Sequence, residues 1–333
     1  MSRWWLWLLL GVLAAAELLL AQGSPLGAAI YAAMLVALPV WGARSPRTTI
    51  RNLTAALILL PIIRLLGSIP TSALVPPVVR YLSISAIVVL AVALALRAMD
   101  LRWRAIGFTY DRLLPQLAFG CGGLLIGVLA HLITGDSVPQ RWDLPLALLI
   151  GCGLAIAEEL VFHGVLQVAL ARAGTRAWWL YGALIFAIVH IGSGSAVHVV
   201  FVFSVGLLFS AFAWWSGSII GVIIAHALAN VTTLALLPRA LAAGDELTAW
   251  TIAAGTLLWL VAVLWLLLRT MARPQAAPLR PRSEIRERRL EYNLGYSELA
   301  ILSGVSMRAL VALEHDLDEA DLRDIDRVLR VLV

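Results

Sequence analysis

The chain has 333 residues, of which 61% are hydrophobic and only 14% are charged, and its mean hydropathy is +0.91. Soluble globular domains carry about 25% charged residues, so the composition excludes an ordinary soluble protein and predicts an all-α, polytopic membrane protein. Every basic residue behind the net charge of +5 is an arginine, and most arginines flank apolar segments, so the charge does not indicate binding to nucleic acid.

Apolar segments long enough to cross a bilayer follow one another as far as Leu268. We expect about ten transmembrane helices, over residues 4–21, 25–43, 53–68, 81–97, 115–133, 144–170, 177–191, 196–215, 219–237 and 248–268. The segment 53–68 is short and contains Pro61 and Arg64, whereas 144–170 is long enough to be tilted or broken. The first apolar run could pass for a signal peptide, but no cleavage site is clear and more spans follow, so we expect a helix.

Arginines are unevenly distributed among the loops that connect these spans. If the N-terminus is inside the cell, the internal loops and the start of the tail carry Arg44, Arg47, Arg51, Arg97, Arg102, Arg104, Arg112, Arg172, Arg176, Arg269 and Arg273. The external loops carry only Arg80, Arg141 and Arg239. Because cytoplasmic loops are enriched in basic residues, we expect both termini in the cytoplasm. The lysine-free, arginine- and alanine-rich usage favours a multi-pass protein of the bacterial plasma membrane.

The composition changes abruptly after Leu268. Residues 271–281 form a linker rich in proline and arginine, and residues 282–333 are charged and periodic, as in a small soluble four-helix domain. Its helices are expected over 283–293, 297–302, 306–315 and 318–332, with Ser297 and Ser306 as N-caps and Gly304 in a left-handed turn. The predicted parts are the N-terminal spans 1–110, a core 111–270, the linker 271–281 and the tail 282–333.

Two adjacent acids, Glu158 and Glu159, lie inside one of the most apolar stretches of the core. An ionisable group at membrane depth costs roughly 2.5–3.5 kcal/mol, so the pair needs partners in the interior of the bundle. Glu159 and His163 share a helix face, whereas Glu158 points about 100° away from Glu159. Candidate partners lie in two further apolar segments, Phe186–His190 and His226–Asn230. The alternative is a polar clamp between helices without catalysis.

These residue types suit peptide hydrolysis, which needs an activated water, a proton shuttle and donors for the oxyanion. A glutamate in apolar surroundings can accept a proton from water near neutral pH, and a histidine beside it can hold the same water. His226 and Asn230 are four residues apart on one helix face and can donate hydrogen bonds to an oxyanion. Three helices can thus bring one full set of groups to one buried point.

Three patterns occur in order along the core: Glu158 to His163, Phe186 to His190, and His226 to Asn230. They resemble the motifs EExxxR, FxxxH and HxxxN/D of the CPBP intramembrane proteases, also called ABI or type II CAAX prenyl endopeptidase-like proteins. The resemblance extends from about Pro115 to Leu237 and implies an endopeptidase in the lipid bilayer that cleaves a membrane-associated protein or peptide.

The resemblance also implies a role for each of these side chains. Glu158 would be the general base and Glu159 a positioning carboxylate. His190 would position the water, and His226 and Asn230 would form the oxyanion site. Phe186 and His163 would support them from the same motifs.

His163 departs from the family pattern, which has arginine at this position. Arginine is permanently charged and offers a fixed fork of donors, and histidine does neither. Either His163 ionises beside Glu159 and replaces the arginine, or the site is altered. A weak or inactive member would act as a membrane-anchored regulator or peptide-immunity protein through its tail. A transporter that uses the buried acids for proton coupling is a third hypothesis, which no inverted hydropathy repeat supports.

The same groups leave open whether a metal takes part. Glu158, His190 and His226 could bind zinc, with water as the fourth ligand. The chain has no H-E-x-x-H pattern, and the family's chemistry can be drawn without a metal, so we expect no cofactor and keep zinc as the alternative. His131 and His198 lie in no motif, and we expect a structural role for both.

The tail carries a second resemblance. Residues 294–314 resemble the helix-turn-helix of Cro/repressor-type (XRE) proteins, which implies a reading helix that begins at Ser306, Met307 and Arg308. Only Arg308 is a good ligand for a base edge or a phosphate, and acids outnumber arginines after Arg282. Because phosphate neutralisation supplies most of the affinity for DNA, DNA and a cytoplasmic protein are equal candidates as partner of the tail.

Overall fold

The computed structural model describes residues 4–69, 75–110, 113–134, 143–173, 177–193, 195–243 and 282–314, and the short pieces 327–328 and 331–332. Within these residues the protein is helical and has no β-strand, which confirms the predicted all-α class. The chain divides into two compact units, Met1–Leu264 and Trp265–Val333, and each is described by itself. The predicted division into four parts stays a prediction.

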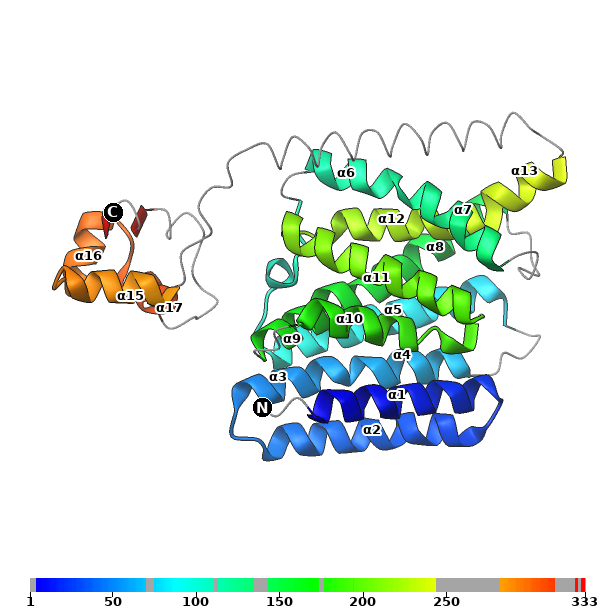
Figure 1. Ribbon diagram of the computed structural model, residues 1–333, viewed down its shortest axis with the longest axis horizontal. Helices are drawn as coiled ribbons and strands as arrows, with labels where there is room; N and C mark the ends of the chain where they lie inside the picture. The colour runs from blue at the N-terminus through cyan, green and yellow to red at the C-terminus, as the bar shows by residue number, and fades with distance from the viewer. Residues whose placement is uncertain are drawn as a thin grey trace. The chain divides into compact units, whose positions relative to one another are not determined.

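The first unit is a bundle of apolar helices, many of which run side by side (Figure 1). Its α-helices are α1 (Trp4–Ala21), α2 (Pro25–Arg44), α3 (Thr48–Leu57), α4 (Leu59–Ser68), α5 (Pro77–Ala98), α6 (Leu113–Cys121), α7 (Gly123–Thr134), α8 (Leu144–Glu159), α9 (Gln167–Arg172), α10 (Trp178–Ile188), α11 (Ala196–Ser216), α12 (Ile220–Val231) and α13 (Leu237–Ala243). The π-helices η3 (Leu160–Leu166) and η5 (Thr232–Leu236) and the 3-10 turns η1 (Trp103–Ile106) and η4 (Ile191–Ser193) connect some of them.

Eight helical stretches of the described residues are long and apolar enough to cross a membrane. They correspond to eight of the predicted spans and support a multi-pass membrane protein. The span predicted over 53–68 begins earlier, because α3 starts at Thr48 and continues into α4. The span predicted over 177–191 is the shorter helix α10. The predicted span 248–268 and linker 271–281 lie outside the described residues, and the orientation of the termini stays a prediction.

The long segment predicted over 144–170 is one helical rod, Leu144–Arg172, with a π-helix in its middle. The expected break or tilt is therefore a π-helical turn: α8 continues through the wider helix η3 into α9. All seven residues of η3 are buried, and η3 begins directly after Glu159. Because π-bulges occur frequently at functional sites, the backbone itself marks this position as unusual.

Glycines bring α7 into close contact with α12. A side chain added at Gly123 would overlap the backbone of Ala225, and one at Gly127 would approach the carbonyl oxygen of Ala229 to 2.6 Å. In membranes, small residues at helix interfaces let the two backbones approach closely, and the resulting van der Waals contacts drive association. Since α12 carries His226, these glycines hold one of the motif helices in place.

We predict that Gly123→Ala destabilises the first unit by about 1–3 kcal/mol, because the added methyl group meets backbone that cannot move aside. The thermal unfolding midpoint of the purified chain in detergent measures the effect. Gly182→Ala is the matched control, since nothing lies within 4 Å of a side chain added there. Alanine is the better helix former, so the control should be neutral or stabilising. Equal midpoints for the two variants would contradict the close packing.

An ion pair joins three N-terminal helices of this unit. The carboxylate of Glu17 on α1 accepts hydrogen bonds from Nε and Nη2 of Arg64 on α4, at 2.5 Å each. It also accepts one from the hydroxyl of Tyr31 on α2, at 2.5 Å. Glu17 and Tyr31 are fully buried. The bidentate pair explains how Arg64 is tolerated in an apolar helix, because a buried charge is costly only while it lacks a partner.

The second unit contains α15 (Arg282–Glu291), α16 (Tyr296–Ser303) and α17 (Met307–Glu314). They enclose a small core of Ile285, Leu299, Val305, Leu310, Leu313, Val328 and Leu332. Ser306 caps α17 as predicted, since its Oγ accepts the N–H of Ala309 at 3.2 Å. Gly304 adopts the predicted left-handed conformation, with a φ of 68°. The predicted cap at Ser297 is wrong, because α16 begins one residue earlier and Glu298 accepts the N–H of Gly295. The helix-turn-helix assignment stays a prediction.

A buried ion pair holds α15 against α17. Arg289 donates from Nε and Nη2 to the carboxylate of Glu314 at 2.6 and 3.0 Å, and the Tyr296 hydroxyl donates to it at 2.7 Å. Burial raises the pKa of the Glu314 carboxyl, but the hydrogen bonds from Arg289 and Tyr296 outweigh it and hold this pKa below its usual range. The pair therefore stabilises the folded unit above the ordinary carboxyl pKa, and this stabilisation is lost as the pH falls through the lowered value.

We predict that Glu314→Gln destabilises the second unit by about 2–3 kcal/mol at pH 7, because it leaves the buried Arg289 without its anion. The rate of limited proteolysis after residue 282, in the full-length chain, measures the opening of this unit. The difference from wild type should disappear well below pH 4, where Glu314 is protonated in both states. Glu291→Gln, at an exposed position of α15, is the control. Unchanged proteolysis of Glu314→Gln at pH 7 would refute the structural role of the pair.

Candidate active site

The motif side chains come from three helical elements of the first unit. Glu158 and Glu159 end α8, His190 follows α10, and His226 and Asn230 lie one turn apart on α12. Helices α8 and α12 are in extensive contact, which brings the acids next to His226. The structure thus places the predicted residues around one region of the membrane unit.

Glu159 is completely buried and is bound on both of its carboxylate oxygens. Oε2 accepts a hydrogen bond from Nδ1 of His163 at 2.5 Å, and Oε1 accepts one from Nδ1 of His226 at 2.6 Å. A carboxylate that binds the far nitrogen of a histidine fixes the tautomer and the direction of that ring. Glu159 therefore orients His226 and ties α8 to α12.

Glu158 faces the two other histidine nitrogens without touching them. Its Oε2 atom lies 3.9 Å from Nε2 of His190 and 4.0 Å from Nε2 of His226. These distances are too long for direct hydrogen bonds and suit a bridging water about 2.8 Å from each atom. Oε2 is buried and has no hydrogen-bond partner, which is unusual for a carboxylate oxygen.

The backbone fixes the orientation of His190. Its Nδ1 lies 2.7 Å from the carbonyl oxygen of Phe186, which can only accept, so Nδ1 carries the hydrogen. The Phe186 ring also packs against the imidazole, with 4.8 Å between the ring centroids. Nε2 is therefore the nitrogen that faces Glu158. The FxxxH spacing has a physical reason here, because its two residues bind one another across a helical turn.

Hydrogen-bond counting restricts the protonation of this site. Glu158, His190 and His226 direct three atoms at one region, and each can act as an acceptor. One water has only two hydrogens to donate. One water can therefore hydrogen-bond to all three atoms only if one of the three groups donates a hydrogen to the water oxygen. His226 is placed for this, since a proton on Nε2 gives a cation between Glu158 and Glu159.

His163 is engaged through both ring nitrogens. Nδ1 lies 2.5 Å from Oε2 of Glu159, and Nε2 lies 3.2 Å from the carbonyl oxygen of Gly206 on α11. Because both partners are acceptors, the ring makes both hydrogen bonds only as an imidazolium, with a hydrogen on each nitrogen. It is buried, with its edges toward Phe186 and Phe209. At the position where the motif has arginine, His163 thus offers one donor to Glu159, from Nδ1, and one to the Gly206 carbonyl, from Nε2.

Asn230 is held only loosely. Its Nδ2 lies 3.5 Å from the carbonyl oxygen of Gly151, at the outer limit of a hydrogen bond. Asn230 lies one turn beyond His226 and lines the same cavity. Its amide can therefore turn towards a ligand at little cost.

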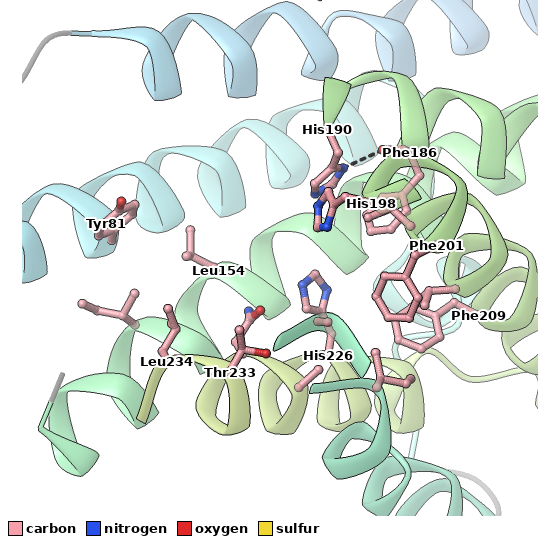
Figure 2. Close-up of a pocket in the computed structure, with 17 residues that line it drawn as sticks. Tyr81, Leu154, Phe186, His190, His198, Phe201, Phe209, His226, Thr233 and Leu234 are labelled. Carbon is pink, nitrogen blue, oxygen red and sulfur yellow. Dashed lines mark hydrogen bonds between the residues drawn. The ribbon is translucent and has the colours of Figure 1, made fainter. Parts of the chain in front are cut away.

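A cavity of about 320 Å³ opens beside these residues (Figure 2). Its lining is mainly apolar and comprises Tyr81, Ile126, Ala130, Ile150, Leu154, Phe186, His190, His198, Phe201, Val202, Val205, Phe209, His226, Ala229, Asn230, Thr233 and Leu234. Glu158 is not among these residues, although both of its histidine neighbours are. An apolar cavity with a few polar groups at one place is the usual form of a ligand site.

From the sequence, a structural role is expected for His198, and the structure places this residue in the lining of the cavity. It lies in the first turn of α11, outside every motif, and its sequence position links it to neither acid. Figure 2 shows its imidazole beside that of His190, on the side of the cavity that faces His226. The two imidazoles are close enough to interact electrostatically. Only the fold reveals this proximity.

The residue types of Glu158, His190 and His226 suit a zinc site, but the distances between their ligand atoms do not. Two histidines and a carboxylate, with outer hydrogen bonds from the histidines to Glu159 and a carbonyl, form a common zinc ligand set. Ligand atoms of a tetrahedral zinc lie about 3.3 Å apart, whereas Glu158 is 3.9 and 4.0 Å from the two nitrogens. Among the described residues, no group of three or more histidine, cysteine, aspartate and glutamate side chains has the geometry of a metal centre.

Comparison with known proteins agrees with this geometry. Residues 140–232 match a family model described as Type II CAAX prenyl endopeptidase Rce1-like. The match contains all three motifs and supports the CPBP family and a membrane-bound peptidase. No curated protein and no solved structure matches the chain.

We predict that His163→Phe lowers the stability of the first unit by about 3 kcal/mol or more, because Glu159 stays buried without its cation. His163→Arg should lose much less, since arginine restores the charge and the donors. The thermal unfolding midpoint in detergent distinguishes the two. If the phenylalanine variant is as stable as wild type, Glu159 does not need the cation and the assignment of His163 fails.

Proposed function

We propose that this chain is an intramembrane endopeptidase that hydrolyses a peptide bond in a membrane-associated protein or peptide. One observation carries the proposal: Oε2 of Glu158 lies 3.9 Å from Nε2 of His190 and 4.0 Å from Nε2 of His226, which are distances that a single water can bridge. The three residues come from separate segments of the bundle. A purely structural clamp between helices would join these groups directly, as Glu17 and Arg64 are joined. The match of residues 140–232 to a peptidase family supports the same reaction class.

In the proposed reaction, Glu158 removes a proton from the bridging water while the water oxygen attacks the carbonyl carbon of the substrate. His190 accepts the second hydrogen of this water through Nε2 and fixes its direction. The carbonyl oxygen becomes an oxyanion, which accepts hydrogen bonds from Nε2 of His226 and from the Asn230 amide. Glu158 then returns its proton to the amide nitrogen as the C–N bond breaks.

The donor role of His226 depends on Glu159. Its Nδ1 already donates to Glu159, so Nε2 can donate only when the ring carries both hydrogens. The site would then hold two carboxylates and two imidazoliums and would be neutral as a whole. Charge balance of this kind is what a group of ionised side chains needs inside a bilayer.

Zinc is the alternative to a histidine-held water. Glu158, His190 and His226 would be its ligands, and the metal would lower the pKa of a bound water and polarise the substrate carbonyl. The spacing of the three atoms favours the metal-free reaction, and we propose that no cofactor is required.

The second candidate is a scaffold without catalysis that acts as a membrane-anchored regulator or peptide-immunity protein. The substitution of the motif arginine by His163 favours it. The contacts of His163 with Glu159 and Gly206 weigh against it, because they supply the cation and donors that the substitution removes. We therefore place the protease first.

For the second unit we propose a helix-turn-helix module. The left-handed Gly304 between α16 and α17, and the cap at Ser306, fit such a turn. Helix α17 would present Met307 and Arg308 to the partner. The acidic composition makes a cytoplasmic protein as good a partner as DNA.

The proposed class of substrate is broader than the name of the matched family model suggests. The matched model is named for prenyl endopeptidases, but prenylated C-a-a-X substrates are a eukaryotic expectation. The lysine-free composition favours a bacterial source. We therefore propose a membrane-associated protein or peptide segment and do not require a prenyl group.

We predict that Glu158→Gln, at unchanged protein level, abolishes processing of the substrate, because the amide cannot accept the proton of the water. Quantitative proteomics of membranes from cells with the wild-type or the variant chain should reveal one membrane protein that stays unprocessed. Asp100→Asn, outside the cavity and the motifs, is the control acid.

Two further arms separate the alternatives. Processing that continues in Glu158→Gln removes the proposed catalytic role and favours the regulator, whose effect should instead end when residues 282–333 are deleted. Processing that stops after dialysis of wild-type membranes against a strong chelator, and returns with zinc, favours the metal reaction.

A further inference from the structure

The polar side chains of the cavity differ in whether the protein satisfies their hydrogen bonds. His190, His226, Asn230 and Thr233 each hydrogen-bond to a protein atom. His198 does not: its Nδ1 is buried and has no partner. The three motif histidines all use Nδ1 to bind a protein atom, whereas Nδ1 of His198 has no such partner.

The position of His198 is fixed from the backbone side. Ser195 caps α11, and its Oγ accepts the backbone N–H of His198 at 3.3 Å. This cap holds the first turn of α11, from which the imidazole reaches the cavity beside His190 (Figure 2). The imidazole that carries the unpaired nitrogen is thus held on a helix rather than on a loop, and Nδ1 itself is covered by the protein.

A peptide in this cavity would bring backbone N–H and C=O groups into mainly apolar surroundings. Each such group loses its water and needs a new partner, and few lining side chains can supply one. A histidine nitrogen can accept from an N–H or donate to a C=O, depending on its tautomer. A hydrogen bond between Nδ1 of His198 and a backbone N–H or C=O of the bound peptide would therefore satisfy both groups.

We propose that His198 is a substrate-binding residue, whose Nδ1 hydrogen-bonds to the peptide backbone next to the bond that is cleaved. The proposal rests on the proposed protease function. It makes His198 a binding group and not a participant in proton transfer. In the empty protein Nδ1 is covered, so the imidazole turns about its Cβ–Cγ bond to bring this nitrogen to a bound peptide.

Three substitutions test which atom matters. His198→Asn places an amide oxygen or nitrogen close to the position of Nδ1, whereas His198→Gln extends it towards the position of Nε2, and His198→Leu removes hydrogen bonding. The probe is the precursor that accumulates in Glu158→Gln cells. Its conversion is followed by pulse-chase in cells that carry each full-length variant at equal level.

At low precursor level, we expect His198→Leu and His198→Gln to process about ten-fold more slowly than wild type, as for the loss of one hydrogen bond. His198→Asn should stay within about three-fold. When the precursor is overexpressed, the Leu and Gln variants should recover to within about two-fold, because substrate binding is weakened and the chemical step is not.

The outcomes separate the two proposals. If no precursor accumulates in Glu158→Gln, the protease function fails and the role of His198 fails with it. If a precursor accumulates there but His198→Leu processes it at the wild-type rate, the protease stands and the role of His198 is refuted. A loss that is equal in all three variants, or that persists at high precursor level, also refutes binding through Nδ1.

Discussion

The arrangement of the site depends on the carboxylate of Glu159. This group lies at the end of α8, is fully buried, and binds one imidazole from its own rod and one from α12. Its hydrogen bond to Nδ1 of His226 turns the opposite nitrogen of that ring, Nε2, towards Glu158. The less exposed acid, Glu159, therefore builds the site, and the more exposed one, Glu158, is the acid that we propose as the general base.

Adjacent glutamates take different roles here because a helix turns by about 100° per residue. Glu159 points to the interface with α12 and finds two donors, whereas Glu158 points to the gap that His190 and His226 enclose. Both acids sit at the same depth in the same rod, so their chemistry is set by partners and not by burial alone. The π-helix η3 begins directly after Glu159, next to the point where the two glutamate side chains diverge.

Sequence reasoning predicted the features that depend on a continuous apolar segment or on a short motif. The apolar segments predicted most of the spans, and three short patterns predicted which side chains converge. It could not predict contacts between distant segments that share no pattern. Glu17 and Arg64 are 47 residues apart, and nothing in either segment names the other. The position of His198 in the cavity was not predicted for the same reason. The predicted cap at Ser297 was wrong because Glu298 accepts the N–H of Gly295 at the start of α16.

The fate of His163 shows what a motif departure means once the fold is known. By itself, histidine for arginine suggests a lost charge. In place, the ring lies between two acceptors, the Glu159 carboxylate and the Gly206 carbonyl, and the hydrogens it needs there make it a cation. That cation balances Glu159, so the charge of the whole site depends on what accompanies Glu158. A protonated His226, or a zinc ion with hydroxide, would each make the site neutral. Charge therefore does not separate the two reactions. The separations of 3.9 and 4.0 Å admit a water and are wider than the ligand spacing of zinc, which is why we propose the metal-free reaction.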